Sequence, residues 1–158
     1  MWEYLPSKAV PDPLPLAREI LKEVEVFSIN YPESCGMFGT ENETQIIEAM
    51  KKLNVPLILF RVGERGLYSI AEGKHWFVPS VGRKDAVDPT GCGNCSTAAA
   101  LYGFREGFDP ITVGYIANVA ASYNVKQYGP MFDMGPETRI EALALVNRMA
   151  AEYQNSGK

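Results

Sequence analysis

The alternation of strand and helix patterns in the first half of the chain limits the possible folds more than any other feature of the sequence. Two compact runs of aliphatic, β-branched and aromatic residues, VEVFSIN at 24–30 and PLILFRV at 56–62, predict buried strands. An amphipathic helix is expected at 14–22, and a helical pattern at 42–53 separates the two strands. Strands that alternate with helices in this way predict an α/β fold, with a mostly parallel sheet and flanking helices.

The remaining segments extend this pattern. Residues 2–5 predict a short strand, and GLYSIAEGKHWFVPSV at 66–81 predicts a β-hairpin that turns at 72–74. Further helices are expected in the second half of the chain, at about 96–106, from the Asp-Pro pair at 109–110 to about 125, and from the Pro-Glu pair at 136–137 onward.

Helical spacing also predicts caps and core-facing side chains. Asn42 and Gln45 have the spacing of a capping box at the start of the helix that precedes the second strand. Two sets of apolar side chains are expected to face inward, Leu16, Ile20 and Leu21 in the first helix and Ile140, Leu143, Val146 and Met149 in the last.

Length and composition suit one globular domain that spans residues 1–158. The chain is 46% hydrophobic and 22% charged, and its net charge of −4 offers no basic field for nucleic acid or for an anionic membrane. Its three cysteines do not suggest a disulfide framework. The sequence has neither a secretory signal pattern nor an apolar run long enough to span a bilayer, so we expect a cytoplasmic protein.

A glycine-rich loop, Thr-Gly-Cys-Gly-Asn at 90–94, comes directly before an Ala-rich helical pattern. The glycines allow successive N–H groups to point into one concavity, and the helix adds its free N–H groups and the positive end of its dipole. The segment therefore predicts an anion site that could hold a phosphate or a phosphoryl group in transfer. A turn that only caps a helix would have the same sequence.

The sequence VDPTGCGN at 87–94 resembles the signature of the PfkB-type carbohydrate kinases of the ribokinase superfamily, which is usually close to VDTTGAGD. Three other segments follow the order of that family. Residues 30–33 are similar to its N-x-x-E motif, residues 62–66 to its nucleotide-contacting loop, and 118–129 to the late helix and loop that closes over the adenine. The resemblance covers nearly the whole chain, but only the C-terminal half of such a kinase.

The resemblance implies a fold and an activity. The fold would be the C-terminal portion of a Rossmann-like, three-layer ribokinase-type fold, with the N-terminal half and the lid absent. The activity would be transfer of the γ-phosphoryl group of ATP to a hydroxyl of a sugar or sugar-like acceptor. Most residues that select the acceptor would lie in the absent half, so the acceptor is not identified.

The resemblance also implies roles for individual residues. Gly91, Cys92 and Gly93 would form the anion hole that faces the γ-phosphate. The nucleotide would be contacted by Asn30, Gly63, Gly66 and Asn118. Glu33 would organise Mg²⁺, a hard cation that keeps several waters, and Asp88 and Thr90 would bind a monovalent cation such as K⁺.

The sequence departs from the family pattern at two positions. Asn94 stands where the family has the catalytic Asp, and an amide does not accept a proton usefully near neutral pH. Arg61 stands where relatives often have Thr near the phosphates. The absence of the N-terminal half should also leave a sheet edge exposed, which favours pairing with a second copy as a homodimer.

Two other functions stay open. Asn94 and the missing half are compatible with a non-catalytic nucleotide-binding module. Cys92 and Cys95 form a C-x-x-C pair at a helix start, as in dithiol oxidoreductases. The pair lies past the midpoint of the chain, whereas a thioredoxin-like domain would carry it early. Zinc has little support, since only Cys35 and His75 remain as partners without ligand spacing.

Overall fold

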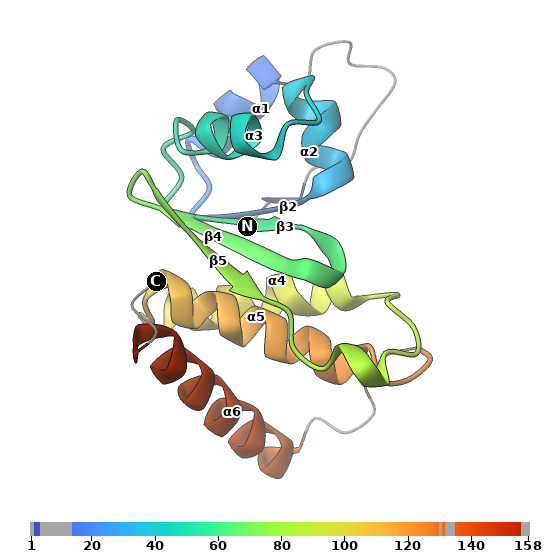
Figure 1. The fold of residues 1–158 in the computed structure, drawn as a ribbon. Helices are drawn as coiled ribbons and strands as arrows, with labels where there is room; N and C mark the ends of the chain where they lie inside the picture. The colour runs from blue at the N-terminus through green and yellow to red at the C-terminus, as the bar shows by residue number, and fades with distance from the viewer. Residues whose placement is uncertain (1, 4–13, 130, 132–134, 156–158) are drawn as a thin grey trace.

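The computed structural model describes residues 2–3, 14–129, 131 and 135–155, and in it five strands form one sheet between layers of helices (Figure 1). The strands lie side by side in chain order, as β1 (Trp2–Glu3), β2 (Val26–Asn30), β3 (Leu57–Arg61), β4 (Gly66–Ala71) and β5 (Lys74–Pro79). β1, β2 and β3 pair in parallel, and β4 is antiparallel to both β3 and β5. Only β4 among these strands runs in the opposite direction, so the predicted α/β sheet with a hairpin is confirmed. Residues 4–5 of the first predicted strand lie outside the described residues.

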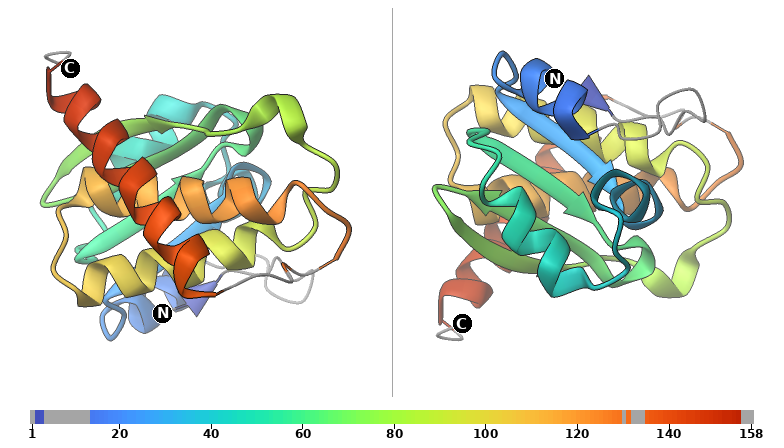
Figure 2. Two further views of the ribbon diagram at one scale, coloured as in Figure 1. Left: turned by 90° about the horizontal axis from the view of Figure 1, so that it is seen from below. Right: turned by 90° about the horizontal axis from the view of Figure 1, so that it is seen from above.

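The helices cover both faces of the sheet. The first face carries α1 (Leu14–Leu21), α2 (Tyr31–Phe38) and α3 (Glu43–Met50), and the second carries α4 (Cys92–Arg105) and α5 (Pro110–Asn124). α6 (Pro136–Asn155) lies across the outer side of α5 (Figure 2). Short 3₁₀ turns occur at Gly63–Arg65 and Arg83–Asp85. None of the helices in the described ranges combines the length and apolarity that a membrane crossing requires.

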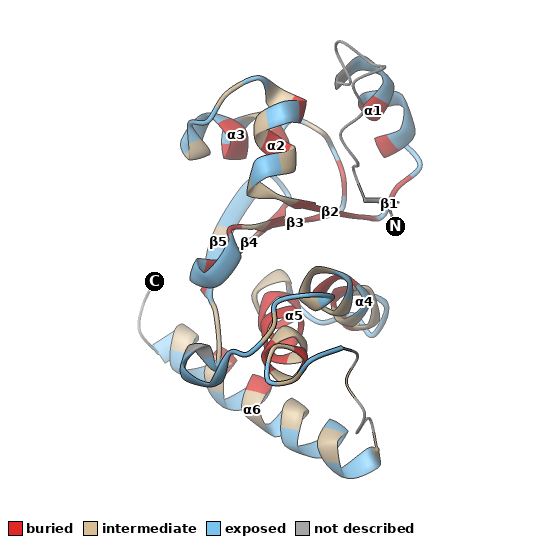
Figure 3. Ribbon diagram, turned by 90° about the vertical axis from the view of Figure 1, so that its right-hand side faces the viewer, coloured by how far each residue is buried: buried red, intermediate tan, exposed pale blue. Residues whose placement is uncertain are grey.

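β2 and β3 are buried on both faces of the sheet, which explains why their sequences are nearly continuous apolar runs (Figure 3). Side chains alternate along a strand. Phe27 and Phe60 therefore belong to the core shared with α1, α2 and α3, whereas Val26 and Leu59 belong to the core shared with α4 and α5, on which α6 packs from outside. One sheet thus separates two apolar cores.

The capping box lies at a different helix from the one predicted. At α3, Asn42 accepts a hydrogen bond from the Gln45 amide at 3.1 Å, but the Gln45 side chain accepts from the Thr40 hydroxyl. The reciprocal box forms at the start of α2, a helix that the sequence analysis did not predict, between Asn30 and Glu33. The Pro and Gly residues within YPESCGMF weaken any helical pattern there.

Some predicted core side chains face solvent instead. Leu16 and Ile20 are 57% and 36% exposed, because α1 packs through Ala17 and Leu21, which share a face. Ile140 is 67% exposed. It lies roughly 120° around the helix axis from Val146, which α6 buries together with Ala150.

Candidate active site

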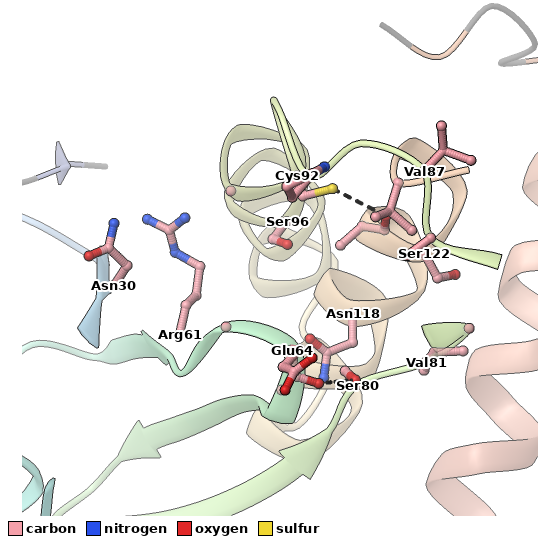
Figure 4. A pocket seen from close by; sticks show the side chains of 18 residues that line it. Asn30, Arg61, Glu64, Ser80, Val81, Val87, Cys92, Ser96, Asn118 and Ser122 are labelled. Carbon is pink, nitrogen blue, oxygen red and sulfur yellow. Dashed lines mark hydrogen bonds between the residues drawn. The ribbon is translucent and has the colours of Figure 1, made fainter. Parts of the chain in front are cut away.

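A pocket of about 620 Å³ opens where β2 and β3 end and reaches the first turn of α4 (Figure 4). Asn30 and Arg61, the last residues of the two strands, are paired in register and both line it. The other walls come from the loops on either side of the hairpin and from α4 and α5, and the loop residues are Gly63, Glu64, Gly66, Ser80, Val81, Gly82, Ala86, Val87 and Pro89. Ligands of open α/β sheets characteristically bind beyond the carboxyl ends of the strands.

The glycine-rich loop passes into a helix earlier than predicted. Gly91 has φ +82 and precedes α4, which begins at Cys92, so Gly93 and Asn94 belong to its first turn. The Cys92 amide donates to the Pro89 carbonyl at 3.1 Å. The amides of Gly93 and Asn94 are first-turn N–H groups, for which an α-helix has no acceptor of its own. This turn therefore offers donors and a positive dipole end to an anion.

The loop before α4 is fastened to the end of α5. The buried Asn124 side chain donates to the Thr90 carbonyl at 2.9 Å and to the Cys92 sulfur at 3.4 Å. The Val125 carbonyl accepts from the amides of Val87 and Asp88, at 2.8 and 3.1 Å. Asn124 is a positioning residue that the sequence analysis missed, although a polar side chain amid apolar residues was a signal that it needed buried partners.

A second fastening ties α4 to the sheet. The Thr97 hydroxyl donates to the Gly93 carbonyl at 2.8 Å, and Ser28 in the middle of β2 lies 2.8 Å from the same hydroxyl. Both side chains are buried. The first turn of α4 is therefore held against β2.

Arg61 lies against this first turn. A Cβ atom at Gly93 would collide with Nη1 of Arg61 and would lie 3.3 Å from Cζ, so the guanidinium occupies space that only a glycine leaves open. Figure 4 shows the side chain extending from the strand end, between Asn30 and α4. A cation thus stands beside the positive end of a helix, within the pocket.

The predicted magnesium residue lies next to the pocket rather than in its lining. Glu33 accepts a hydrogen bond from the Asn30 amide at 3.0 Å, and the Glu33 amide donates to the Asn30 side chain at 2.9 Å. In the described part of the chain, no three His, Cys, Asp or Glu side chains cluster as a metal site. A single carboxylate fits Mg²⁺, which is usually held by one or two carboxylates, waters and substrate phosphates.

Three of the predicted nucleotide-contacting residues line the pocket on its β4 and β5 side, Gly63, Gly66 and Asn118. Gly66 has φ +128, and a Cβ there would collide with the Val78 carbonyl. The Asn118 side-chain amide donates to the backbone carbonyls of Val78 and Pro79, at 3.0 and 2.9 Å. Asn118 thereby holds α5 against the end of β5.

The predicted monovalent-cation residues form a local turn. The Asp88 carboxylate accepts from the Thr90 amide at 2.9 Å. Hydrogen bonds from the Thr90 backbone and side chain, and from the Gly129 backbone, lower the pKa of Asp88, so its charge is retained near neutral pH.

The structure brings together only part of the predicted set. The predicted residues that line the pocket are Asn30, Gly63, Gly66, Cys92, Gly93 and Asn118. The predicted residues that do not line the pocket, although each is within three residues of one that does, are Glu33, Asp88, Thr90, Gly91 and Asn94. The Asn94 side chain is exposed.

The cysteine pair is arranged for packing. The Cys92 and Cys95 thiols donate to carbonyls of α5, those of Ala121 and Ala120, at 3.6 and 3.5 Å. Burial, together with the neighbouring Cys92, raises the pKa of the Cys95 thiol. The raised pKa makes the Cys95 thiol a poor nucleophile near neutral pH.

Comparison with known proteins gives a consistent result. The chain matches the family model described as pfkB family carbohydrate kinase over residues 4–137. An uncharacterized sugar kinase of Archaeoglobus fulgidus is 27% identical over 111 residues, which are 70% of this chain and 44% of that protein.

Two solved structures illustrate the similarity of fold. The probable sugar kinase protein of Rhizobium etli has a TM-score of 0.73 at 18% identity, over 84% of this chain and 40% of its own. Arabidopsis thaliana ribokinase, solved with ribose and ATP, has a TM-score of 0.68 at 28% identity, over 82% and 43%.

These matches also set the extent of the similarity. The chain spans less than half the length of each of these relatives. The structural matches show a ribokinase-type fold, and the family match covers most of the chain. The chain therefore belongs to the pfkB family of carbohydrate kinases.

Proposed function

We propose that this chain forms the nucleotide-binding part of a kinase that transfers the γ-phosphoryl group of ATP to a hydroxyl of a sugar or sugar-like acceptor. The observation that carries the proposal is the pocket, in which the ends of β2 and β3, the 63–66 loop and the first turn of α4 border one cavity. Arabidopsis thaliana ribokinase, which was solved with ribose and ATP, supports ATP as the nucleotide.

The phosphate end of the nucleotide would lie against the predicted anion hole at 91–93 and the first turn of α4 that follows Gly91. The Cys92 amide already donates to Pro89, so the amides of Gly93 and Asn94 would be the main donors from this segment. Fixed donors in a pocket stabilise charge that develops on a transferring phosphoryl group without having to reorganise. The bonds from Asn124, Thr97 and Ser28 would keep these donors in place.

Glu33 would hold magnesium together with its waters, since the capping box fixes this carboxylate beside Asn30. The ion would supply neutralisation of phosphate charge. The ionised Asp88 and the Thr90 carbonyl or hydroxyl would hold K⁺ next to the same loop. The mostly apolar wall formed by Val81, Val87 and the α5 residues would receive the base.

Asn94 favours a second candidate function, a non-catalytic nucleotide-binding module. A general base is typically worth 10²–10⁴-fold in rate, and an amide does not replace it. Positioning and the first-turn donors would remain, so weak transfer is compatible with this chain.

Calorimetric titration with ATP and Mg²⁺, followed by a transfer assay with a panel of sugars and nucleosides, separates these functions. Binding with transfer supports the kinase, and binding without transfer supports the module. Absence of binding contradicts both, and thiol-dependent insulin reduction without ATP binding would instead support the oxidoreductase.

A pair of helical glycines provides a matched control for the binding site. Gly93→Ala puts a methyl group into the first turn of α4, against Arg61, and should weaken ATP binding at least about tenfold. Gly36→Ala adds the same methyl group to α2, where nothing lies within 4 Å, and should leave the affinity unchanged. Circular dichroism would check that both variants fold.

A further inference from the structure

We propose that Arg61 binds the terminal phosphate of the nucleotide and makes the pocket selective for a nucleoside triphosphate over the diphosphate. The inference rests on the proposed nucleotide-binding function of the same pocket. It concerns a position at which the sequence departs from the family pattern, so the resemblance assigns no such role to it.

Strand geometry directs Arg61 toward α4. Leu57 and Leu59 face the core that contains α4 and α5, whereas Ile58 and Phe60 face the opposite core. Because side chains alternate along a strand, Arg61 follows Leu57 and Leu59. Its side chain therefore leaves the end of β3 on the face where α4 begins, and it lines the pocket there.

The contact with Gly93 places the guanidinium at one particular point of the helix. A Cβ at Gly93 would collide with Nη1, so the charged group lies against the second residue of α4. The Arg61 guanidinium therefore fills the space that a side chain at residue 93 would need. A branched or even a methyl side chain at this position would displace the guanidinium.

Two positive groups converge at this point. The first turn of α4 presents its N–H groups and the positive end of its dipole, and Arg61 adds a full charge beside it. An anion placed between them would be stabilised by both. A guanidinium presents its donors in a planar fork that matches two phosphate oxygens.

Arg61 lies at the end of the pocket opposite its apolar side chains, which favours contact with the last phosphate of the nucleotide rather than the first. Figure 4 shows the apolar side chains of Val81 and Val87 at one end and Arg61 with Asn30 at the other. In Figure 4 the carboxylate of Glu64, which also lines the pocket, is separated from the guanidinium. A nucleotide whose base occupies the apolar end would extend its phosphates toward Arg61. The third phosphate of a triphosphate would reach closer to the guanidinium than the second phosphate of a diphosphate.

Calorimetry with Mg·ATP and Mg·ADP tests this role in variants of the chain. Arg61→Met keeps much of the length but removes the charge, and it should weaken ATP binding roughly tenfold to a hundredfold. ADP affinity should stay within about twofold. Arg61→Lys keeps the charge without the fork and should lie in between. Arg105→Met is the matched control, since this exposed arginine pairs with Glu25 at the far end of α4, outside the pocket, and its loss should change neither affinity.

The outcomes separate this proposal from the proposed function. A wild-type chain that binds neither nucleotide contradicts the nucleotide-binding function and this inference with it. If the wild-type chain binds ATP and Arg61→Met keeps the same affinity, or loses affinity for ATP and ADP equally, the proposed role of Arg61 is wrong. The proposed nucleotide-binding function would still stand. If Arg61→Met does not fold, competition against ATP on the wild type decides, and inorganic tripolyphosphate that competes no better than pyrophosphate overturns the proposal.

Discussion

Under the proposed function, Asn94 is the residue whose substitution should change the rate of phosphoryl transfer most. It is the third residue of α4, and its side chain is exposed. Asn94→Asp should raise the transfer rate by roughly 10²–10⁴-fold, because a carboxylate at this position can accept the acceptor's proton. The rate would be measured with the acceptor found in the panel, in a form of the protein that contains its acceptor-binding residues.

A control with the same change of charge isolates the position. Asn147→Asp adds a carboxylate on the exposed side of α6, away from the pocket, and should leave the transfer rate unchanged. A similar rate for Asn94→Asp and wild type would contradict a proton-accepting role at this position.

The sequence indicated candidate site residues where they are neighbours in one segment, and it missed positioning residues whose role depends on contacts between distant segments. The glycine-rich turn carries its own conformational and helix-start signals, so Gly91 and Gly93 were predicted from neighbouring residues. Asn124 lies 34 residues from its partner Thr90, and Ser28 lies 69 residues from Thr97. Nothing local in either segment specifies which segment packs against it.

At the scale of elements, the predicted starts of α1, α3, α5 and α6 agree with the structure, α2 was not predicted, and the start of α4 was predicted too late. α4 begins at Cys92 rather than near 96, because Gly91 in a left-handed conformation ends the loop and the helix then accommodates Gly93. The composition around Gly93 favours a loop, but hydrogen bonds from Thr97 and packing on β2 favour a helix. Tertiary contacts outweigh a weak local preference of about 1 kcal/mol.

The loop between β3 and β4 offers a test of backbone geometry at this scale. Gly66 begins β4 with φ +128, and a Cβ there would collide with the Val78 carbonyl across the hairpin and lie 2.7 Å from the Ser80 nitrogen. Gly66→Ala should therefore lower the free energy of unfolding by roughly 2–4 kcal/mol, because it adds a backbone clash to an unfavourable conformation. Urea unfolding measures the change.

Gly63 serves as the matched control for that experiment. It also has a positive φ, +65, but a Cβ there would meet nothing within 4 Å. Gly63→Ala should cost only about 1–2 kcal/mol, the conformational penalty alone. Equal losses for the two variants would mean that the close approach of β4 and β5 at Gly66 contributes nothing.

At the scale of the whole molecule, the order of elements along the chain already determined most of the architecture. Alternating strands and helices followed by a hairpin predicted a mostly parallel sheet with flanking helices, and the structure adds that the strands lie in chain order. The sequence did not show how α6 is placed, because its apolar residues can face any helix that leaves a groove. The homodimer expected from an exposed sheet edge remains a prediction, with β1 at one edge of the described sheet.

The layered arrangement makes a prediction about local stability. β2 and β3 are covered on both faces, whereas α6 lies outside α5 and buries chiefly Val146 and Ala150. A helix held by so few buried side chains should open at a lower free energy than the sheet. Native-state hydrogen exchange should therefore show α6 amides exchanging before those of β2 and β3 as urea increases.

Two substitutions on α6 test whether its burial sets that free energy. Val146→Ala removes buried methyl groups and should lower the opening free energy of α6 by about 2 kcal/mol, while Ile140→Ala, on the exposed side, should leave it unchanged. No residue of α6 lines the pocket, so ATP binding should persist in both variants. If α6 and β3 amides exchange with the same free energy in every variant, the two layers unfold as one cooperative unit. In that case α6 would contribute to the stability of the sheet that carries the proposed nucleotide site.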